Sequence, residues 1–243
     1  VLAPEDLVEQ FDRTYNLWEK DDVALRLAHS TRLGKLAADL LGVRAVRLYQ
    51  DQSFFKSPEH AETVWHDDVV SCPFEGKFLT LWIPMHDIPK SMGTMSFATA
   101  SHVHRKHLAL PPENRFDDTL IRRRFSIHNY GALKAGTITA HHGFTLHSAP
   151  GNRGKKVREA YAVQYFEDGC TLRSAEDLAV LDPSDIPSTK RWLHRFSAKQ
   201  RAQCPELPLI YTRPRGTPPP FKAPEKKKKK KARDPLDSLL DEL

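Results

Sequence analysis

The sequence of 243 residues predicts a mainly β fold with flanking helices, of the antiparallel sandwich or jelly-roll type. One observation behind this prediction is an apolar stripe at helical spacing that ends at Gly42. Another is a series of short strand-like runs from Val43 onward, separated by turn residues such as Ser57-Pro58 and Pro150-Gly151. No apolar run reaches the roughly 20 residues that a membrane-spanning helix needs, so we expect no membrane span.

We expect the opening segment, residues 1 to about 42, to be helical. Its clearest part is a stripe at positions i, i+3, i+4, i+7 and i+8, formed by Leu33, Leu36, Ala37, Leu40 and Leu41. Ser30 or Thr31 supplies an N-cap, and Gly42 supplies the left-handed residue that commonly ends a helix.

Five runs after this helix predict strands, at residues 43–49, 77–85, 94–98, 136–141 and 159–166. A second helical stretch, at residues 188–203, is expected to pack outside them. The sequence contains no internal repeat, so the strands predict one sandwich rather than a repeated unit.

The basic charge of the chain is a property of its C-terminal tail. The formal net charge is +6, from 37 Lys and Arg against 31 Asp and Glu. Ten of these cations but only five of the acids lie from Arg213 onward, which leaves residues 1–212 nearly neutral. We therefore divide the chain into a folded domain, residues 1–212, and a Pro- and Lys-rich tail, residues 213–243, expected to be disordered before a short terminal amphipathic helix.

The tail predicts an interaction with a protein or an anionic partner. Its six consecutive lysines, residues 226–231, are typical of a nuclear-localisation or anionic-surface patch, of a solvated linker, or of nonspecific contact with RNA or DNA. The terminal leucines at helical spacing are Leu236, Leu239, Leu240 and Leu243. A helix this short is unstable alone, so we expect it to fold against a partner. For the folded domain we expect no nucleic-acid binding.

The cysteines favour a reducing compartment. Cys72, Cys170 and Cys204 are odd in number and widely spaced, and they form no CxxC pair. With the lysine run, this predicts a cytoplasmic or nuclear protein. The sequence begins with Val1, so a targeting segment that precedes it is compatible with the sequence.

The segment Trp65-His66-Asp67-Asp68 is the first candidate metal-binding motif. Residues i and i+2 of a strand point to the same side, so His66 and Asp68 can reach one metal while Asp67 faces away. One imidazole, one carboxylate and a second imidazole form the facial triad of non-haem Fe(II) oxygenases. A hydrogen-bonded pair at a strand end is the structural alternative.

A second histidine and an arginine follow downstream. His147 comes just after a predicted strand, at a turn rich in small residues, and Arg158 opens the last strand eleven residues later. The same-side neighbours of Arg158 include Ala160 and Ala162, which leave room for a bound molecule. The planar guanidinium suits a carboxylate ligand, while pairing with a structural acid is the alternative.

Together these motifs resemble the phytanoyl-CoA dioxygenase family of Fe(II)- and 2-oxoglutarate-dependent oxygenases over roughly residues 43–170. The matching residues, in order, are Lys56-Ser57-Pro58, the His66-to-Asp68 motif, Cys72-Pro73-Phe74, the strand around Trp82, the stretch from Gly93 to His102, and His147, Asn152 and Arg158. Departures are Ala100-Ser101-His102, Gly136-Thr137 and Ser148-Ala149, where the family has Gly-Ser-His, Gly-Asp and Gly-Ser.

The resemblance implies a double-stranded β-helix of the cupin-like jelly-roll type, with Fe(II) bound by His66, Asp68 and His147. It implies 2-oxoglutarate and O₂ as cosubstrates, with Arg158 on the far carboxylate of 2-oxoglutarate and Trp82 and Ser148 as further contacts. The implied activity is hydroxylation of a small or lipophilic organic molecule, with succinate and CO₂ as coproducts. Asp68 in the motif implies oxygenation rather than halogenation.

Other hypotheses have their own sequence features. A non-catalytic jelly-roll adaptor would act through the basic tail, but retention of three ligand residues and Arg158 argues against it. A zinc hydrolase on the same residues would leave Arg158 unexplained, and catalytic zinc usually has other ligand sets. His102 and His104 also have i, i+2 spacing, and a surface loop is the favoured interpretation there.

Overall fold

The computed structural model describes residues 11–58, 60–104, 114–177, 187–218 and 220. The predictions for the lysine run and the terminal leucines, within residues 221–243, therefore lie outside the described residues. The strand β12 (Leu209–Thr212) ends where the tail was predicted to begin.

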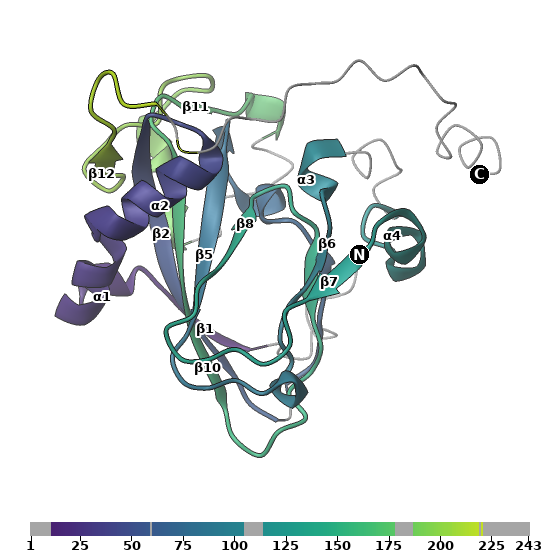
Figure 1. Cartoon of the computed structure of the whole chain (residues 1–243). Helices are drawn as coiled ribbons and strands as arrows, with labels where there is room; N and C mark the ends of the chain where they lie inside the picture. Colours follow the sequence, from purple (N-terminus) through teal and green to yellow (C-terminus); the bar gives the residue numbers. More distant parts are fainter. Residues whose placement is uncertain (1–10, 59, 105–113, 178–186, 219, 221–243) are drawn as a thin grey trace, which may run out of the picture.

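Two antiparallel sheets face each other (Figure 1). The larger sheet, in the order β1-β2-β10-β5-β8, comprises β1 (Asp12–Tyr15), β2 (Ala45–Lys56), β10 (Arg158–Glu167), β5 (Phe78–Pro84) and β8 (Thr139–His142), with β12 also paired to β2. The smaller sheet, in the order β3-β9-β6-β7, comprises β3 (Thr63–His66), β9 (His147–Ala149), β6 (Ser96–Ala98) and β7 (Ile127–Asn129). A two-stranded ladder joins β4 (Phe74–Glu75) to β11 (Thr171–Leu172). The predicted jelly roll is confirmed.

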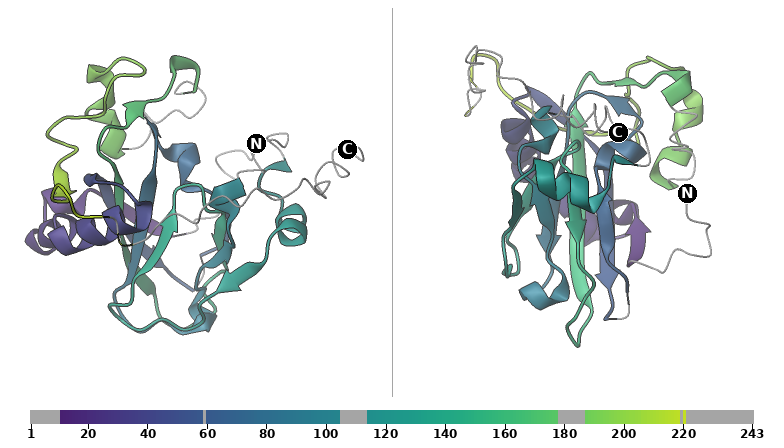
Figure 2. Two further views of the ribbon diagram at one scale, coloured as in Figure 1. Left: turned by 45° about the horizontal axis from the view of Figure 1, so that its top comes forward. Right: turned by 90° about the vertical axis from the view of Figure 1, so that its right-hand side faces the viewer.

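Helices cover the outer faces of both sheets (Figures 1 and 2). The helices α1 (Asp22–Ala28) and α2 (Thr31–Leu41) pack on the larger sheet through buried residues such as Ala37 and Leu41. On the opposite side, α3 (Ser101–His104) and α4 (Asp118–Arg124) lie beside β6 and β7, where Ile121 contributes to a small apolar cluster with Trp65. The helices therefore lie outside the two sheets, and the inner faces remain available for a site.

The predicted helix before Gly42 is confirmed in its last part and wrong in its first. Ser30 caps α2 by accepting a hydrogen bond from the backbone N–H of Leu33, and Gly42 ends α2 with φ of 65°. The helical prediction fails at β1 and at the 3₁₀ helix η2 (Leu17–Glu19). Asn16 between them adopts a left-handed φ of 53°, and β1 pairs with β2, so a sheet edge satisfies the backbone groups of this segment.

Four of the predicted strands match β5, β6, β8 and β10, whereas the first is longer than expected. The strand β2 runs on to Lys56 and carries a β-bulge. The register of the ladder shows the bulge: Gln164 of β10 pairs with Gln50, whereas the next residue, Tyr165, pairs with Leu48. Tyr49 is the extra residue. A bulge reverses the alternation of side chains, so Leu48 packs under the helices while Gln50 faces the other sheet.

The predicted helix at residues 188–203 is wrong. The described part of this region contains only α6 (Pro187–Lys190) and the 3₁₀ helix η8 (Leu193–Arg195). Between them, the Trp192 side chain is fully buried and stacks on Phe74, with ring centroids 5.7 Å apart. The burial of this large ring against Phe74 stabilises the break between the two short helices, so no continuous helix forms. The remaining 3₁₀ helices are η3 (Asp68–Ser71) and η4 (Lys90–Met92).

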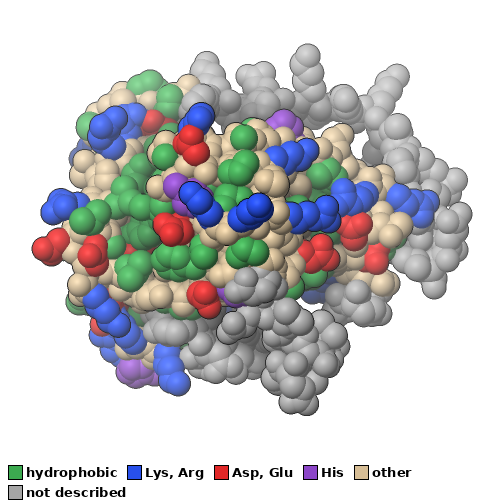
Figure 3. Space-filling model, turned by 90° about the horizontal axis from the view of Figure 1, so that it is seen from below, with side chains coloured by type: hydrophobic (Ala, Val, Ile, Leu, Met, Phe, Trp, Pro, Cys, Tyr) green, Lys and Arg blue, Asp and Glu red, His purple; other side chains and the backbone are tan. Residues whose placement is uncertain are grey.

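Charge on the described surface is mixed. On the face seen from below, Lys and Arg side chains run in a row, and Asp and Glu side chains lie on both sides of it (Figure 3). This arrangement agrees with the near-neutral composition of residues 1–212. Within the described part of the chain, no helix has the length and apolar character that crossing a membrane requires.

Candidate active site

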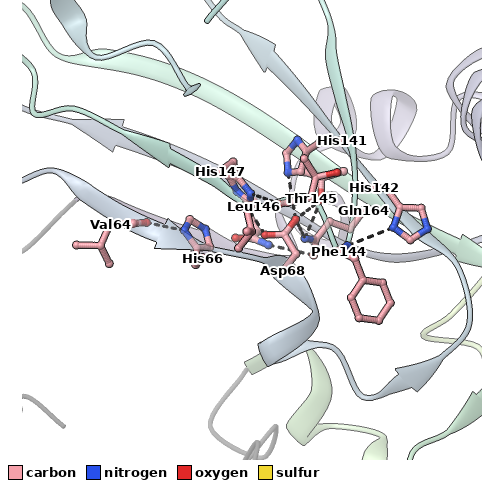
Figure 4. Close-up of polar contacts among 12 residues, drawn as sticks. Val64, His66, Asp68, His141, His142, Phe144, Thr145, Leu146, His147 and Gln164 are labelled. Atoms are coloured by element: carbon pink, nitrogen blue, oxygen red, sulfur yellow. Dashed lines mark hydrogen bonds and ion pairs between the residues drawn. The ribbon is translucent and has the colours of Figure 1, made fainter. Parts of the chain in front are cut away.

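Three predicted ligand residues meet between the two sheets. His66 is the last residue of β3, His147 is the first of β9, and the two are register partners. Asp68 opens η3. One ligand atom from each of the three residues lies within 4.8 Å of the others (Figure 4). Two imidazoles and one carboxylate at this spacing can hold one metal ion, and they are the donor set that suits non-haem Fe(II).

Asp68 does not reach the site by the strand alternation that the sequence analysis predicted. The strand β3 ends at His66, and the backbone N–H of Asp68 donates to the carbonyl of Gly143 at 3.0 Å. The turn that follows β8 therefore holds Asp68. Asp67, predicted to face away from the metal, is fully buried and lines the same cavity as His66.

Three side chains hold the Oδ2 atom of the Asp68 carboxylate. Its Oδ2 accepts a hydrogen bond from Thr80 Oγ1 at 2.6 Å and lies 3.2 Å from His141 Nε2. Gln164 Nε2 donates to the same oxygen at 3.4 Å. The other oxygen, Oδ1, lies 3.7 Å from His147 Nε2. Side chains of the larger sheet thus hold Oδ2, and Oδ1 lies on the side of His147.

Both histidines are oriented by the backbone. His66 Nδ1 lies 2.9 Å from the carbonyl oxygen of Val64, and His147 Nδ1 lies 2.9 Å from that of Thr145. A carbonyl oxygen only accepts, so each Nδ1 carries the proton and each Nε2 presents a lone pair. Both rings therefore have the tautomer that a metal at Nε2 requires.

Burial and neighbouring charges keep these donors in their metal-binding forms. Burial by itself would raise the pKa of Asp68, but the hydrogen bond from His141 and the charges of the surrounding imidazoles hold that pKa well below its ordinary value. Burial, reinforced by His66 and His141, lowers the pKa of His147 well below the ordinary histidine value. At neutral pH the carboxylate is ionised and the His147 imidazole is neutral, as metal binding requires.

Arg158 lines the same cavity. Its side chain is only 3% exposed, and burial lowers its pKa to about 10, so it remains charged at neutral pH. Its Nη1 donates to the carbonyl of Gly93 at 2.5 Å, and its guanidinium carbon lies 5.6 Å from the ring centre of Trp82. Nε has no partner, and no carboxylate among the described residues pairs with the guanidinium. The structural-acid interpretation therefore fails in the described part of the chain.

A cavity of about 350 Å³ joins the two groups. Its lining includes all six predicted site residues: His66, Asp68, Trp82, His147, Ser148 and Arg158. It also includes Gln164, which lies on the same side of its strand as Arg158, as strand alternation predicts, and residues that the sequence analysis did not assign to the site, among them Phe11, Arg13, Tyr15, Gln50, Gln52 and Phe54. A signal for Gln50 and Gln52 was present in the sequence, because polar residues in a buried strand such as β2 often belong to a site. The residues of β1 gave no such signal, because the sequence analysis assigned that segment to a helix.

The second histidine cluster does not form a metal site in the described residues. His102 and His104 lie on the short helix α3, and the ring of His102 stacks on His142 at 5.5 Å between centroids. Among the described residues, the group of His66, Asp68 and His147 is the one set whose ligand atoms converge.

An antiparallel jelly roll that gathers two imidazoles, a carboxylate and a buried guanidinium in one cavity defines the class of Fe(II)- and 2-oxoglutarate-dependent oxygenases. The model of the phytanoyl-CoA dioxygenase (PhyH) family matches residues 5–160, more than half of the chain. The chain belongs to this family.

Solved structures agree with the fold. The 2-oxoglutarate-dependent epimerase SnoN of nogalamycin biosynthesis is 26% identical with a TM-score of 0.66, covering 83% of this chain and 78% of its own. The carbocyclase SnoK of the same biosynthesis is 23% identical with a TM-score of 0.66, covering 84% of this chain and 78% of its own. EctD from S. alaskensis is 20% identical with a TM-score of 0.55, over 66% of this chain and 58% of its own. No curated protein sequence matches the chain.

These findings establish the cofactor class. SnoN has been solved with Fe³⁺ and 2-oxoglutarate. The donor set here, two neutral imidazoles and an ionised carboxylate, fits iron, and the unpartnered Nε of buried Arg158 fits an incoming carboxylate. The chain is an oxidoreductase that uses Fe(II), 2-oxoglutarate and O₂.

Proposed function

We propose that the chain hydroxylates a small or lipophilic organic substrate, with succinate and CO₂ as coproducts. His66, Asp68 and His147 hold the iron, and Arg158 binds the far carboxylate of 2-oxoglutarate. The observation that carries this proposal is that all four groups line one cavity of about 350 Å³. When bound, iron with 2-oxoglutarate and O₂ supplies the oxidising chemistry.

The residues of the chain orient the reactants and exclude water. Three ligands on one side of a metal leave positions open for a cosubstrate and O₂. Thr80, His141 and Gln164 hold Oδ2 of Asp68, which directs Oδ1 to the metal. This support fixes the carboxylate before the metal arrives, and such outer contacts raise metal affinity.

The cavity wall beside Arg158 includes apolar side chains. Trp82 and Ala162 are cross-strand neighbours with 4% and 1% exposure, and they make an apolar wall beside Arg158. A dicarboxylate of matching length would place one carboxylate on Arg158 and leave the other end for the iron. Ser148, next to His147 on the cavity wall, is positioned as a hydrogen-bonding contact for the cosubstrate.

The test is succinate formation by the full chain, loaded anaerobically with Fe(II), then given 2-oxoglutarate and O₂ without added substrate. We expect slow turnover that is lost in Arg158→Ala. Absence of both turnover and calorimetric 2-oxoglutarate binding would contradict the proposal and favour the adaptor function, which truncation at Arg213 would then abolish.

Product analysis separates hydroxylation from other oxidative outcomes, since SnoN and SnoK are described as an epimerase and a carbocyclase. With a substrate in hand, ¹⁸O₂ should place one labelled oxygen in the product. A stereoisomer or a new ring without label would contradict hydroxylation while leaving the cofactor assignment intact.

A further inference from the structure

One face of β1 forms a wall of the cavity. The residues of this wall have no role in the proposed binding of iron and 2-oxoglutarate. Phe11, Arg13 and Tyr15 alternate along the chain and all line the cavity, while Asp12 and Thr14 do not. This period of two places Arg13 and Tyr15 on the cavity side of the edge strand β1, and Phe11 lies directly before the strand. Arg13 is the register partner of Phe54 on β2, whose ring lines the same wall.

The guanidinium of Arg13 is held by aromatic rings. Its central carbon lies 4.8 Å from the ring centre of Phe11, 5.3 Å from Tyr15 and 5.8 Å from Phe54. Nη1 also donates to the Tyr15 hydroxyl at 2.6 Å. A guanidinium has five N–H donors, and one such bond leaves four of them. Among the described residues, no carboxylate pairs with Arg13.

The charges of the proposed cofactors balance without Arg13; this step rests on the proposed function. Iron(II) and Arg158 together carry three positive charges, and Asp68 and dianionic 2-oxoglutarate carry three negative charges. Asp67, the other acid of the lining, is fully buried, whereas Arg13 is exposed. Arg13 is left as an exposed positive charge at the rim, on a separate strand from Arg158.

We propose that Arg13 binds the anionic group of the substrate, which is an organic carboxylate or phosphate with an apolar body. A planar guanidinium held against aromatic rings presents its fork to a carboxylate or phosphate and loses little freedom on binding. Phe54, Val64 and Met95 supply apolar surface in the same lining for the body of the substrate. Arg13 is thus a specificity-determining residue, distinct from the arginine that binds the cosubstrate.

The test compares matched acids and amides on the full chain with Fe(II) and 2-oxoglutarate, without O₂. The probes are 2-naphthoate against 2-naphthamide, indole-3-acetate against indole-3-acetamide, and 2-naphthyl phosphate to separate phosphate from carboxylate recognition. Calorimetry should show at least one anion binding about tenfold or more tightly than its neutral counterpart, as a charge-assisted bond predicts.

Variants assign that preference to Arg13. In Arg13→Gln the ratio of anion to amide affinity should fall to about one, and in Arg13→Lys it should be intermediate, because an ammonium lacks the fork. The matched control is Arg26→Gln, an exposed arginine on α1 outside the cavity, which should keep the wild-type ratio.

Three results would overturn the proposal: no binding of any anion, equal binding of anion and amide by the wild type, or a preference that survives in Arg13→Gln. A fall in 2-oxoglutarate affinity with no change in the anion-to-amide ratio would assign Arg13 to the cosubstrate and also overturn it. Because the binding assay needs no turnover, failure of succinate formation would contradict the proposed function separately.

Discussion

The two sheets of the jelly roll differ in regularity and in what they contribute to the site. The larger sheet has long ladders, with ten residue pairs between β10 and β2. The smaller sheet has strands of three or four residues, and the pairing of β3 with β9 is irregular between Thr63 and His66. Nevertheless, the smaller sheet carries His66 and His147.

The difference shows how an irregular region can hold a precise site. Each ligand of the smaller sheet is fixed by a local backbone contact, as His147 is by the carbonyl of Thr145. The proposed ligand between the sheets, Asp68, is fixed by three side chains of the larger sheet. The long ladders thus provide the rigid support, and the short strands leave room for the metal and its ligands.

Removing a ligand of the smaller sheet should have the largest effect. His147→Ala removes one of the three proposed metal ligands, so we expect loss of detectable 2-oxoglutarate turnover and of Co(II) binding, while the larger sheet keeps the chain folded. Succinate assay, metal titration and circular dichroism measure this. The control, His194→Ala, changes an exposed histidine outside the cavity and should behave as wild type. Wild-type turnover in His147→Ala would contradict the ligand assignment.

A pair of core substitutions compares the sheets directly. Leu146 and Leu48 are both fully buried, one in the cluster under the smaller sheet and one under the helices of the larger sheet. Each change to Ala should lower the free energy of unfolding by about 2–5 kcal/mol. Only Leu146→Ala should also weaken Co(II) binding, because Leu146 precedes His147. Equal metal affinity in the two variants would show that the sheets support the site alike.

Thr80→Val tests the support from the larger sheet. It removes the 2.6 Å hydrogen bond to Asp68 Oδ2 at nearly constant volume, and such outer contacts are worth about 10–100-fold in metal affinity. The matched control is Thr139→Val on the neighbouring strand β8, where the buried hydroxyl has no partner. Titration with Co(II) should separate the two variants. Unchanged affinity in Thr80→Val would mean that the other contacts of Asp68 suffice.

Lys56 tests the junction between the sheets. It is fully buried at the end of β2, where Nζ donates to Thr63 Oγ1 of β3 at 3.2 Å. Burial, with the nearby charge of Arg158, lowers its pKa to about 8. Between pH 8 and about 10.5 the unfolded chain therefore binds more protons than the folded chain, so stability rises with pH across this window.

Lys56→Met should remove the free-energy cost of burying the charged ammonium group. It should also remove the pH dependence of stability that this group causes. We expect the free energy of unfolding at pH 7 to increase by on the order of 2 kcal/mol, and its rise between pH 8 and 10 to flatten. Denaturant unfolding at several pH values measures this, with exposed Lys20→Met as the control. A lower stability at pH 7 would show that the bond to Thr63 outweighs the cost of burying the charge.

Much of the site was predictable because its residue types and order along the chain are distinctive. His66, Asp68, His147 and Arg158 were assigned from spacing and family resemblance, and all four line one cavity. Arg13 and Tyr15 could not be found this way, since their role depends on β1 pairing with β2 some 40 residues later. A local pattern holds no information on that pairing.

The sequence by itself determined the elements whose stabilising groups lie within a few residues. The helix α2 is one, because its apolar stripe, the Ser30 cap and Gly42 are all local. Tertiary structure decided the rest. The bulge at Tyr49, which turns Gln50 toward the cavity, depends on a partner strand more than 100 residues away. The position of Asp68 depends on the carbonyl of Gly143, and the broken helix near Trp192 depends on the burial of one ring against Phe74. Local propensity is weak beside such contacts, so the long-range partners determine the outcome.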